Sequence, residues 1–163
     1  MRLSALRRLR GLALLAGVLA LGSWWSLRDG PEDAVLTSAR SLAAAFAAPP
    51  DRTYELVIAH AADPVQIVAA GSRKKLAASE AARLAQTRRR VEGPRLLSLE
   101  DPRVTIDSRR AQLDAILISS ESQPGDLHAE ARRVTAEFEQ SDRWRLSALR
   151  LGPTSKHIPE ARP

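Results

Sequence analysis

The spacing of the apolar residues changes once along this chain, and that change restricts the fold more than any other feature. Between residues 31 and 92, apolar residues recur every three or four positions, as they do on one face of a helix. From Pro94 onward they alternate with polar residues, as in half-buried strands. Helices followed by a run of strands predict an α+β domain, in which about two or three helices pack on a curved antiparallel sheet of about four or five strands.

The helical half divides at its glycines and prolines. A first helix is predicted over residues 31–48, because Pro and acidic residues open it and a pair of prolines stops it. Residues 51–62 fit either a strand or a short helix, and we favour the helix. Residues 65–68 predict a short strand, and residues 72–90 predict a long helix with Ser72 at its N-cap.

Three sequences typical of turns divide the strand half: Asp-Pro, Gln-Pro-Gly and Ser-Asp. The first strand is predicted to be interrupted near Asp101-Pro102, and the second is apolar on both faces, which favours a central position. A polar, flexible tail is predicted from residue 152 to residue 163, so that the globular domain covers residues 28–151. The predicted strands are residues 97–106, 112–118, 133–139 and 144–148.

The N-terminal segment has the pattern of an export signal or a membrane anchor. Four arginines within residues 1–10 precede an uncharged run over residues 11–27. As a helix, that run would span about 25 Å, slightly less than a ~30 Å hydrocarbon core. The positive-inside rule keeps residues 1–10 in the cytoplasm and places the globular domain outside it.

Residues 11–27 are either an uncut membrane helix or a signal peptide that is cleaved. Trp24 and Trp25 suit the membrane interface of an uncut helix, whereas Ala20 and Gly22 suit a cleavage site after Gly22. We favour the anchor, since bulky tryptophans so close to the scissile bond disfavour cleavage. The chain is then a single-pass protein of the bacterial inner membrane with its domain in the periplasm, and a secreted protein if the segment is cut.

The net charge of +6 belongs mostly to the N-terminal segment. Residues 1–30 hold five arginines and one aspartate, whereas residues 31–163 hold 20 basic and 18 acidic groups. A nearly neutral domain argues against nucleic acid as a partner. The chain has no cysteine, which excludes disulfide scaffolds, thiolate zinc sites and cysteine nucleophiles. Arginine outnumbers lysine 22 to 3, as in the proteins of GC-rich bacteria.

Over residues 32–151, the order of elements resembles the nuclear transport factor 2-like superfamily, also called the cystatin-like cone. The segments that carry the resemblance are Arg133–Phe138 and Asp142–Leu146, which are similar to the closing hairpin of that family with its buried tryptophan. The resemblance implies a bent sheet that wraps over the N-terminal helix and leaves a pocket. It also implies a choice between enzymes, such as cyclases, isomerases and dehydratases, and non-catalytic binding or assembly domains.

An enzyme of this kind needs an acid or base inside the cone. The candidates are Asp114, Tyr54 and His60. Asp114 shares a strand face with two isoleucines, which would raise its pKa if that face were buried; the alternative is a rim carboxylate beside an arginine, which we favour. No residues have metal-ligand spacing, and no cofactor motif is present. The predicted pocket or core residues are Phe46, Trp144, Phe138 and Ile116.

Two basic runs flank the predicted long helix, and each is either a solvated surface or part of a patch for anionic lipids or an acidic partner. They are Arg73, Lys74, Lys75 and Arg88, Arg89, Arg90. The sequence thus predicts a membrane-anchored envelope protein with a non-catalytic, pocketed domain for ligand binding or assembly, with a protein partner or a second copy bound through the sheet. The alternatives are an exported polyketide-cyclase-like or isomerase-like enzyme, and a lipid-surface module.

Overall fold

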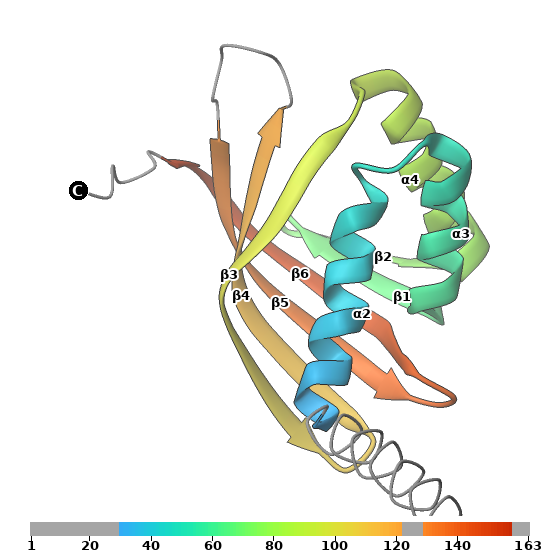
Figure 1. The fold of residues 1–163 in the computed structure, drawn as a ribbon, viewed down its shortest axis with the longest axis vertical. Coiled ribbons are helices and arrows are strands. Elements are labelled where there is room, and N and C mark those ends of the chain that lie inside the picture. The colour runs from blue at the N-terminus through green and yellow to red at the C-terminus, as the bar shows by residue number, and fades with distance from the viewer. Residues whose placement is uncertain (1–29, 122–128, 158–163) are drawn as a thin grey trace, which may run out of the picture.

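The computed structural model describes residues 30–121 and 129–157, which form three helices and one six-stranded sheet. The helices lie on one face of the sheet, and the sheet bends around the first of them (Figure 1). This confirms the predicted α+β class, with more strands than expected. The elements are α2 (Pro31–Ala45), α3 (Pro50–His60), β1 (Ala61–Ala69), β2 (Ser72–Leu76), α4 (Ala78–Glu92), β3 (Arg95–Asp107), β4 (Arg110–Glu121), β5 (Ala129–Gln140) and β6 (Trp144–His157).

The strand order is β2-β1-β6-β5-β4-β3, and one pairing departs from the predicted antiparallel sheet. β1 runs parallel to β6, whereas the other four pairs are antiparallel. Parallel neighbours need a long connection. Here α4 and the strands β3 to β5 lie between β1 and β6 in the chain, which provides that connection.

The first two helices form where the sequence predicts them, and the helical interpretation of residues 51–62 is confirmed. Both begin at a proline, whose missing N–H costs nothing in the first turn. Thr53 then joins the two helices, because its buried Oγ1 donates to the Ala45 carbonyl, 2.7 Å away at the end of α2.

The predicted helix over residues 72–90 is wrong in its first part, since residues 72–76 are the strand β2. Ala70 and Gly71 both have positive φ, 47° and 78°, which makes the two-residue turn of a β1–β2 hairpin. Helix α4 starts only at Ala78, whose N–H donates to Asp63 Oδ1 at 3.3 Å. An acceptor in β1 thus takes the place of the expected Ser72 cap.

The long strands follow the predicted pattern, but each extends beyond the predicted bounds. β3 has a register shift between Glu100 and Arg103, at the interruption expected there. β6 continues to His157, so residues 152–157 are strand where the sequence predicts a flexible tail. Gly152 makes this continuation possible, because a Cβ at that position would lie 3.1 Å from the Arg133 carbonyl oxygen of β5.

The main core lies between α2 and the concave face of the sheet. Its largest buried side chains include Phe138, Leu113 and Val35, and Trp144 is 3% exposed in the same cluster. Burying one such side chain stabilises a fold by roughly 1.5–3 kcal/mol. The hydroxyl of the buried Ser38 donates to the Trp144 carbonyl at 2.9 Å, which fixes α2 against the start of β6.

In the part of the chain that the structure describes, no helix is both long and apolar enough to cross a bilayer. The predicted anchor, residues 11–27, lies outside the described residues, as do Trp24 and Trp25 at its end.

Candidate functional site

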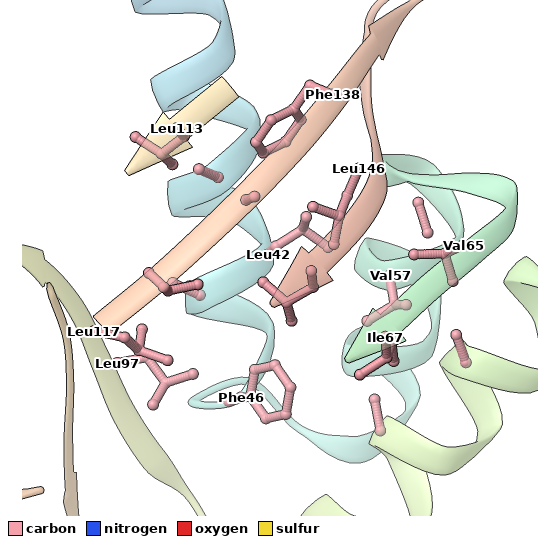
Figure 2. A pocket seen from close by; sticks show the side chains of 18 of the residues that line it. Leu42, Phe46, Val57, Val65, Ile67, Leu97, Leu113, Leu117, Phe138 and Leu146 are labelled. Carbon is pink, nitrogen blue, oxygen red and sulfur yellow. The ribbon is translucent and has the colours of Figure 1, made fainter. Parts of the chain in front are cut away.

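A cavity of about 350 Å³ lies between the helices and the concave face of the sheet. Figure 2 shows aliphatic and aromatic side chains from both layers around it, with Phe46, the residue after α2, at one end and Leu113 and Phe138 at the other. Other labelled lining residues are Leu42, Val57, Val65, Ile67, Leu97, Leu117 and Leu146. The volume is within the range of small-molecule sites.

The cavity exists because alanines take positions where larger side chains would fill the space. Interiors normally pack as densely as organic crystals, so small residues opposite a strongly bent sheet leave a hollow. The alanines that line it come from α2, α4 and the strands: Ala39, Ala43, Ala61, Ala81, Ala85 and Ala136.

Arg88 of α4 is the only charged side chain among the described residues that line the cavity. Its Nε donates to Glu92 Oε1 at 2.8 Å, and its side chain is 67% exposed. Arg88 therefore lies where the cavity meets solvent, and its aliphatic stem covers part of the wall. In the sequence, Arg88 follows Ala81 by seven residues and Ala85 by three, which puts all of them on one stripe of α4. That spacing is the signal for a lining position, whereas the basic run alone indicates only a charged surface.

Asp114 does not face the cavity. In β4 the odd-numbered residues, such as Leu113 and Ala115, pack in the core, so Asp114 lies on the convex face. Its carboxylate accepts hydrogen bonds from Thr135 Oγ1 at 2.7 Å and from Gln112 Nε2 at 2.8 Å. These two bonds, with the charge of Arg133, hold the pKa of Asp114 below its usual value. It is thus an ionised surface carboxylate bound mainly to neutral partners.

Tyr54 and His60 also lie outside the cavity lining. Tyr54 packs against the alanine-rich cluster between the helices. His60 ends α3, where burial and the charges of Arg143 and Arg145 lower its pKa, and its buried Nδ1 has no hydrogen-bond partner among the described residues. The three predicted acid–base candidates therefore do not meet around a common space.

The four predicted pocket or core residues are placed differently from one another. Phe46 and Phe138 line the cavity, and Trp144 belongs to the adjacent core. Ile116 instead lies on the convex face beside Asp114 and is 37% exposed. The prediction for Ile116 is wrong because β4 is apolar on both faces, and the face that carries its alanines and leucines is the one that turns toward the helices.

The two predicted basic runs do not form one patch. Arg73, Lys74 and Lys75 lie exposed on the edge strand β2, where charged residues oppose pairing with other chains. The second run ends α4, and its members bind nearby groups: Arg89 Nε donates to the Ala48 carbonyl at 2.7 Å, and Arg90 pairs with Asp51 at 3.3 Å.

Within residues 30–121 and 129–157, no group of three or more His, Asp or Glu side chains is arranged to hold a metal ion. With the acid–base candidates elsewhere, the cavity offers shape and apolar surface together with one guanidinium group at its opening.

Several solved structures share this architecture. A nuclear transport factor 2-like protein of unknown function from Pseudomonas putida KT2440 is 16% identical, with a TM-score of 0.62, over 81% of this chain and 96% of its own. A candidate ketosteroid isomerase from Shewanella frigidimarina is 17% identical, with a TM-score of 0.59, over 76% and 98%. The CaMKII hub of S. rosetta is 18% identical, with a TM-score of 0.61, over 78% and 98%.

These likenesses confirm the predicted nuclear transport factor 2-like fold. The solved neighbours include a candidate ketosteroid isomerase, a candidate dehydratase, a CaMKII hub and proteins of unknown function, so the fold alone does not select an activity. No family model matches the sequence, and no curated protein matches it.

Proposed function

We propose that this chain is a membrane-anchored bacterial envelope protein whose nuclear transport factor 2-like domain binds an apolar small molecule without transforming it. The observation that carries the proposal is the cavity of about 350 Å³, whose described lining is aliphatic and aromatic apart from Arg88. Binding there is driven by removal of apolar ligand surface from water, at roughly 25 cal/mol per Å².

The lining argues against the enzymatic alternative. A general acid or base must reach the substrate within hydrogen-bond distance or through one water molecule. Among the described lining residues there is no Asp, Glu, His or Tyr, and the predicted candidate Asp114 lies on the opposite face of the sheet. The described lining of this cavity therefore offers no acid or base for the isomerase or dehydratase chemistry that the names of two structural neighbours suggest.

The convex face argues against assembly through the sheet. An assembly surface of this kind is expected to expose a broad apolar area. Here the partly exposed Ile116 lies among bonded polar side chains, such as Asp114 with Thr135 and Arg150 with Glu137.

The lipid-surface alternative requires both basic runs to lie near the membrane. Residue 30, which follows the proposed anchor, lies at one end of α2, and Arg89 contacts Ala48 just past the other end. A 15-residue helix is about 22 Å long. Figure 1 shows α4 beside α3, at the level of the C-terminal part of α2 rather than of its first turn. An anchor before residue 30 is therefore attached at the end of α2 that is farther from Arg89.

The binding proposal is tested with N-phenyl-1-naphthylamine, a neutral fluorescent apolar probe, and the purified full chain in lipid nanodiscs, with empty nanodiscs as the blank for partition of the probe into lipid. We expect saturable binding that Ala85→Phe weakens by about tenfold or more, because a phenyl ring at this lining position fills the cavity. The matched control is Thr87→Phe, on an exposed position of the same helix, which should bind the probe like the wild type. Equal binding by both folded variants would contradict the proposal.

The anchor proposal is tested separately. A reporter that is active only outside the cytoplasm, fused after Pro163, should be active, and the protein should stay with membranes after a carbonate wash. A soluble mature chain that begins at Ser23 would reject the anchor in favour of cleavage after Gly22, and reporter activity confined to the cytoplasm would reject both.

A further inference from the structure

The opening of the cavity combines an apolar wall with a guanidinium group. Leu84 lines the cavity and is nevertheless 54% exposed, so the apolar wall continues out to solvent. Arg88, one turn later on α4, lines the same cavity while most of its side chain is in water. A ligand that lies along this wall and leaves the cavity would meet the Arg88 guanidinium at the surface.

The charge around this opening is positive. Glu92 accepts from Arg88 Nε at 2.8 Å and pairs with Arg95 Nε at 3.4 Å, so one carboxylate serves two guanidinium groups. Arg89, the neighbour of Arg88, binds the neutral carbonyl of Ala48. The neighbouring side chains of Arg88, Arg89 and Glu92 in α4 carry a net charge of +1. That charge attracts an anion and repels a cation.

The geometry of Arg88 leaves it able to bind an anionic group. Its bond to Glu92 uses Nε, one of the five N–H donors of a guanidinium group. The bond restricts the orientation of the side chain, and the two Nη groups take no part in it, so this bond uses none of their N–H donors. Guanidinium groups bind carboxylates and phosphates through paired hydrogen bonds, which a hydroxyl head cannot match.

We propose, building on the apolar-ligand function above, that the ligand is a single-chain amphiphile whose apolar body fills the cavity and whose anionic head binds at Arg88. A cavity of about 350 Å³ is at the small end of the range for ligand sites, which favours a single medium-length acyl chain over a two-chain lipid. The head is a carboxylate or a phosphate, depending on whether the source is a free fatty acid or a phosphorylated lipid.

The test compares dodecanoate with dodecanol by calorimetric titration of the full chain at pH 8, below micelle formation. We expect dodecanoate to bind about tenfold or more tightly than dodecanol. Arg88→Gln should abolish this preference, because it should weaken the binding of dodecanoate much more than the binding of dodecanol. The matched control Arg83→Gln, on an exposed position of α4 outside the lining, should keep the preference.

Two further measurements make the result decisive. Arg88→Lys retains the charge without the paired hydrogen bonds and should retain part of the preference, which separates loss of charge from loss of fold. Dodecyl phosphate in place of dodecanoate distinguishes a phosphate head from a carboxylate head. Equal affinities of the wild type for dodecanoate and dodecanol, or a preference unchanged in Arg88→Gln, would overturn the inference and leave the apolar-ligand function standing. Failure of both to bind would instead overturn the proposed function.

Discussion

The two faces of the sheet are built from the same strands and have opposite chemistry. The concave face is apolar and incompletely filled, whereas the convex face carries paired polar side chains beside the partly exposed Ile116. Leu113 is buried in the core, and the next residue, Asp114, is an ionised carboxylate in contact with water. Adjacent residues of one strand therefore differ in role, because Leu113 lines the proposed binding site and Asp114 takes no part in it.

The largest expected difference between the faces is in stability. Phe138→Ala on the concave face should lower the free energy of unfolding by roughly 3–5 kcal/mol, since it deletes a large side chain that is 1% exposed. Arg133→Ala, on the convex face of the same strand, should change it by less than about 1 kcal/mol. Urea denaturation of the full chain measures both, and similar losses would refute the assignment of the faces.

A smaller effect is expected at Asp114. Its pKa is lowered in the folded state, so the carboxylate contributes stability at neutral pH that is lost as the pH falls through the folded value. Asp114→Asn should cost no more than about 1 kcal/mol at pH 7, and the difference from wild type should shrink in acid. NMR titration of the carboxyl group checks the cause: a pKa above the ~3.9 of a model peptide would place Asp114 in an apolar environment.

The smallest expected effect belongs to His60, outside both faces. Its folded pKa is below the unfolded value, so the unfolded chain binds more protons, and stability should fall as the pH drops below about 6.5. His60→Gln should flatten this part of the stability profile and leave probe binding in the cavity unchanged. Thermal melts between pH 7.5 and pH 5.5 measure the slope; an unchanged slope in the variant would assign the pH dependence to other groups.

Local patterns in the sequence predict much of the fold. The prolines at the starts of α2 and α3 and the alternation in β5 are short-range signals, and all three elements form where expected. The β1–β2 hairpin escapes prediction because Ala70-Gly71 is an uncommon pair for a turn with two positive φ values. Without that turn, Ser72 has the pattern of a helix cap.

The site is harder to predict because it depends on which face of a strand turns inward. The pattern of β4 shows two apolar faces and does not rank them, so the sequence alone assigns Ile116 to the core and leaves Asp114 open between the cavity and the rim. Only the packing of α2 against Leu113 and Ala115 decides between the faces. A cavity is also invisible to such patterns, since it depends on alanines from several elements meeting in space.

The position of β6 affects how the domain folds while the chain is being synthesised. β6 is the last strand of the described chain, yet it lies inside the sheet between β1 and β5, and Ala61 of β1 pairs with Leu146 of β6 across most of the domain's sequence. Pairings between such distant residues form slowly, because a long loop must close first. During synthesis, the apolar wall provided by β1 and the helices stays without its partner strand until residues 144–157 arrive. A chain that ends early would expose that wall to other chains, which makes truncated forms prone to aggregate.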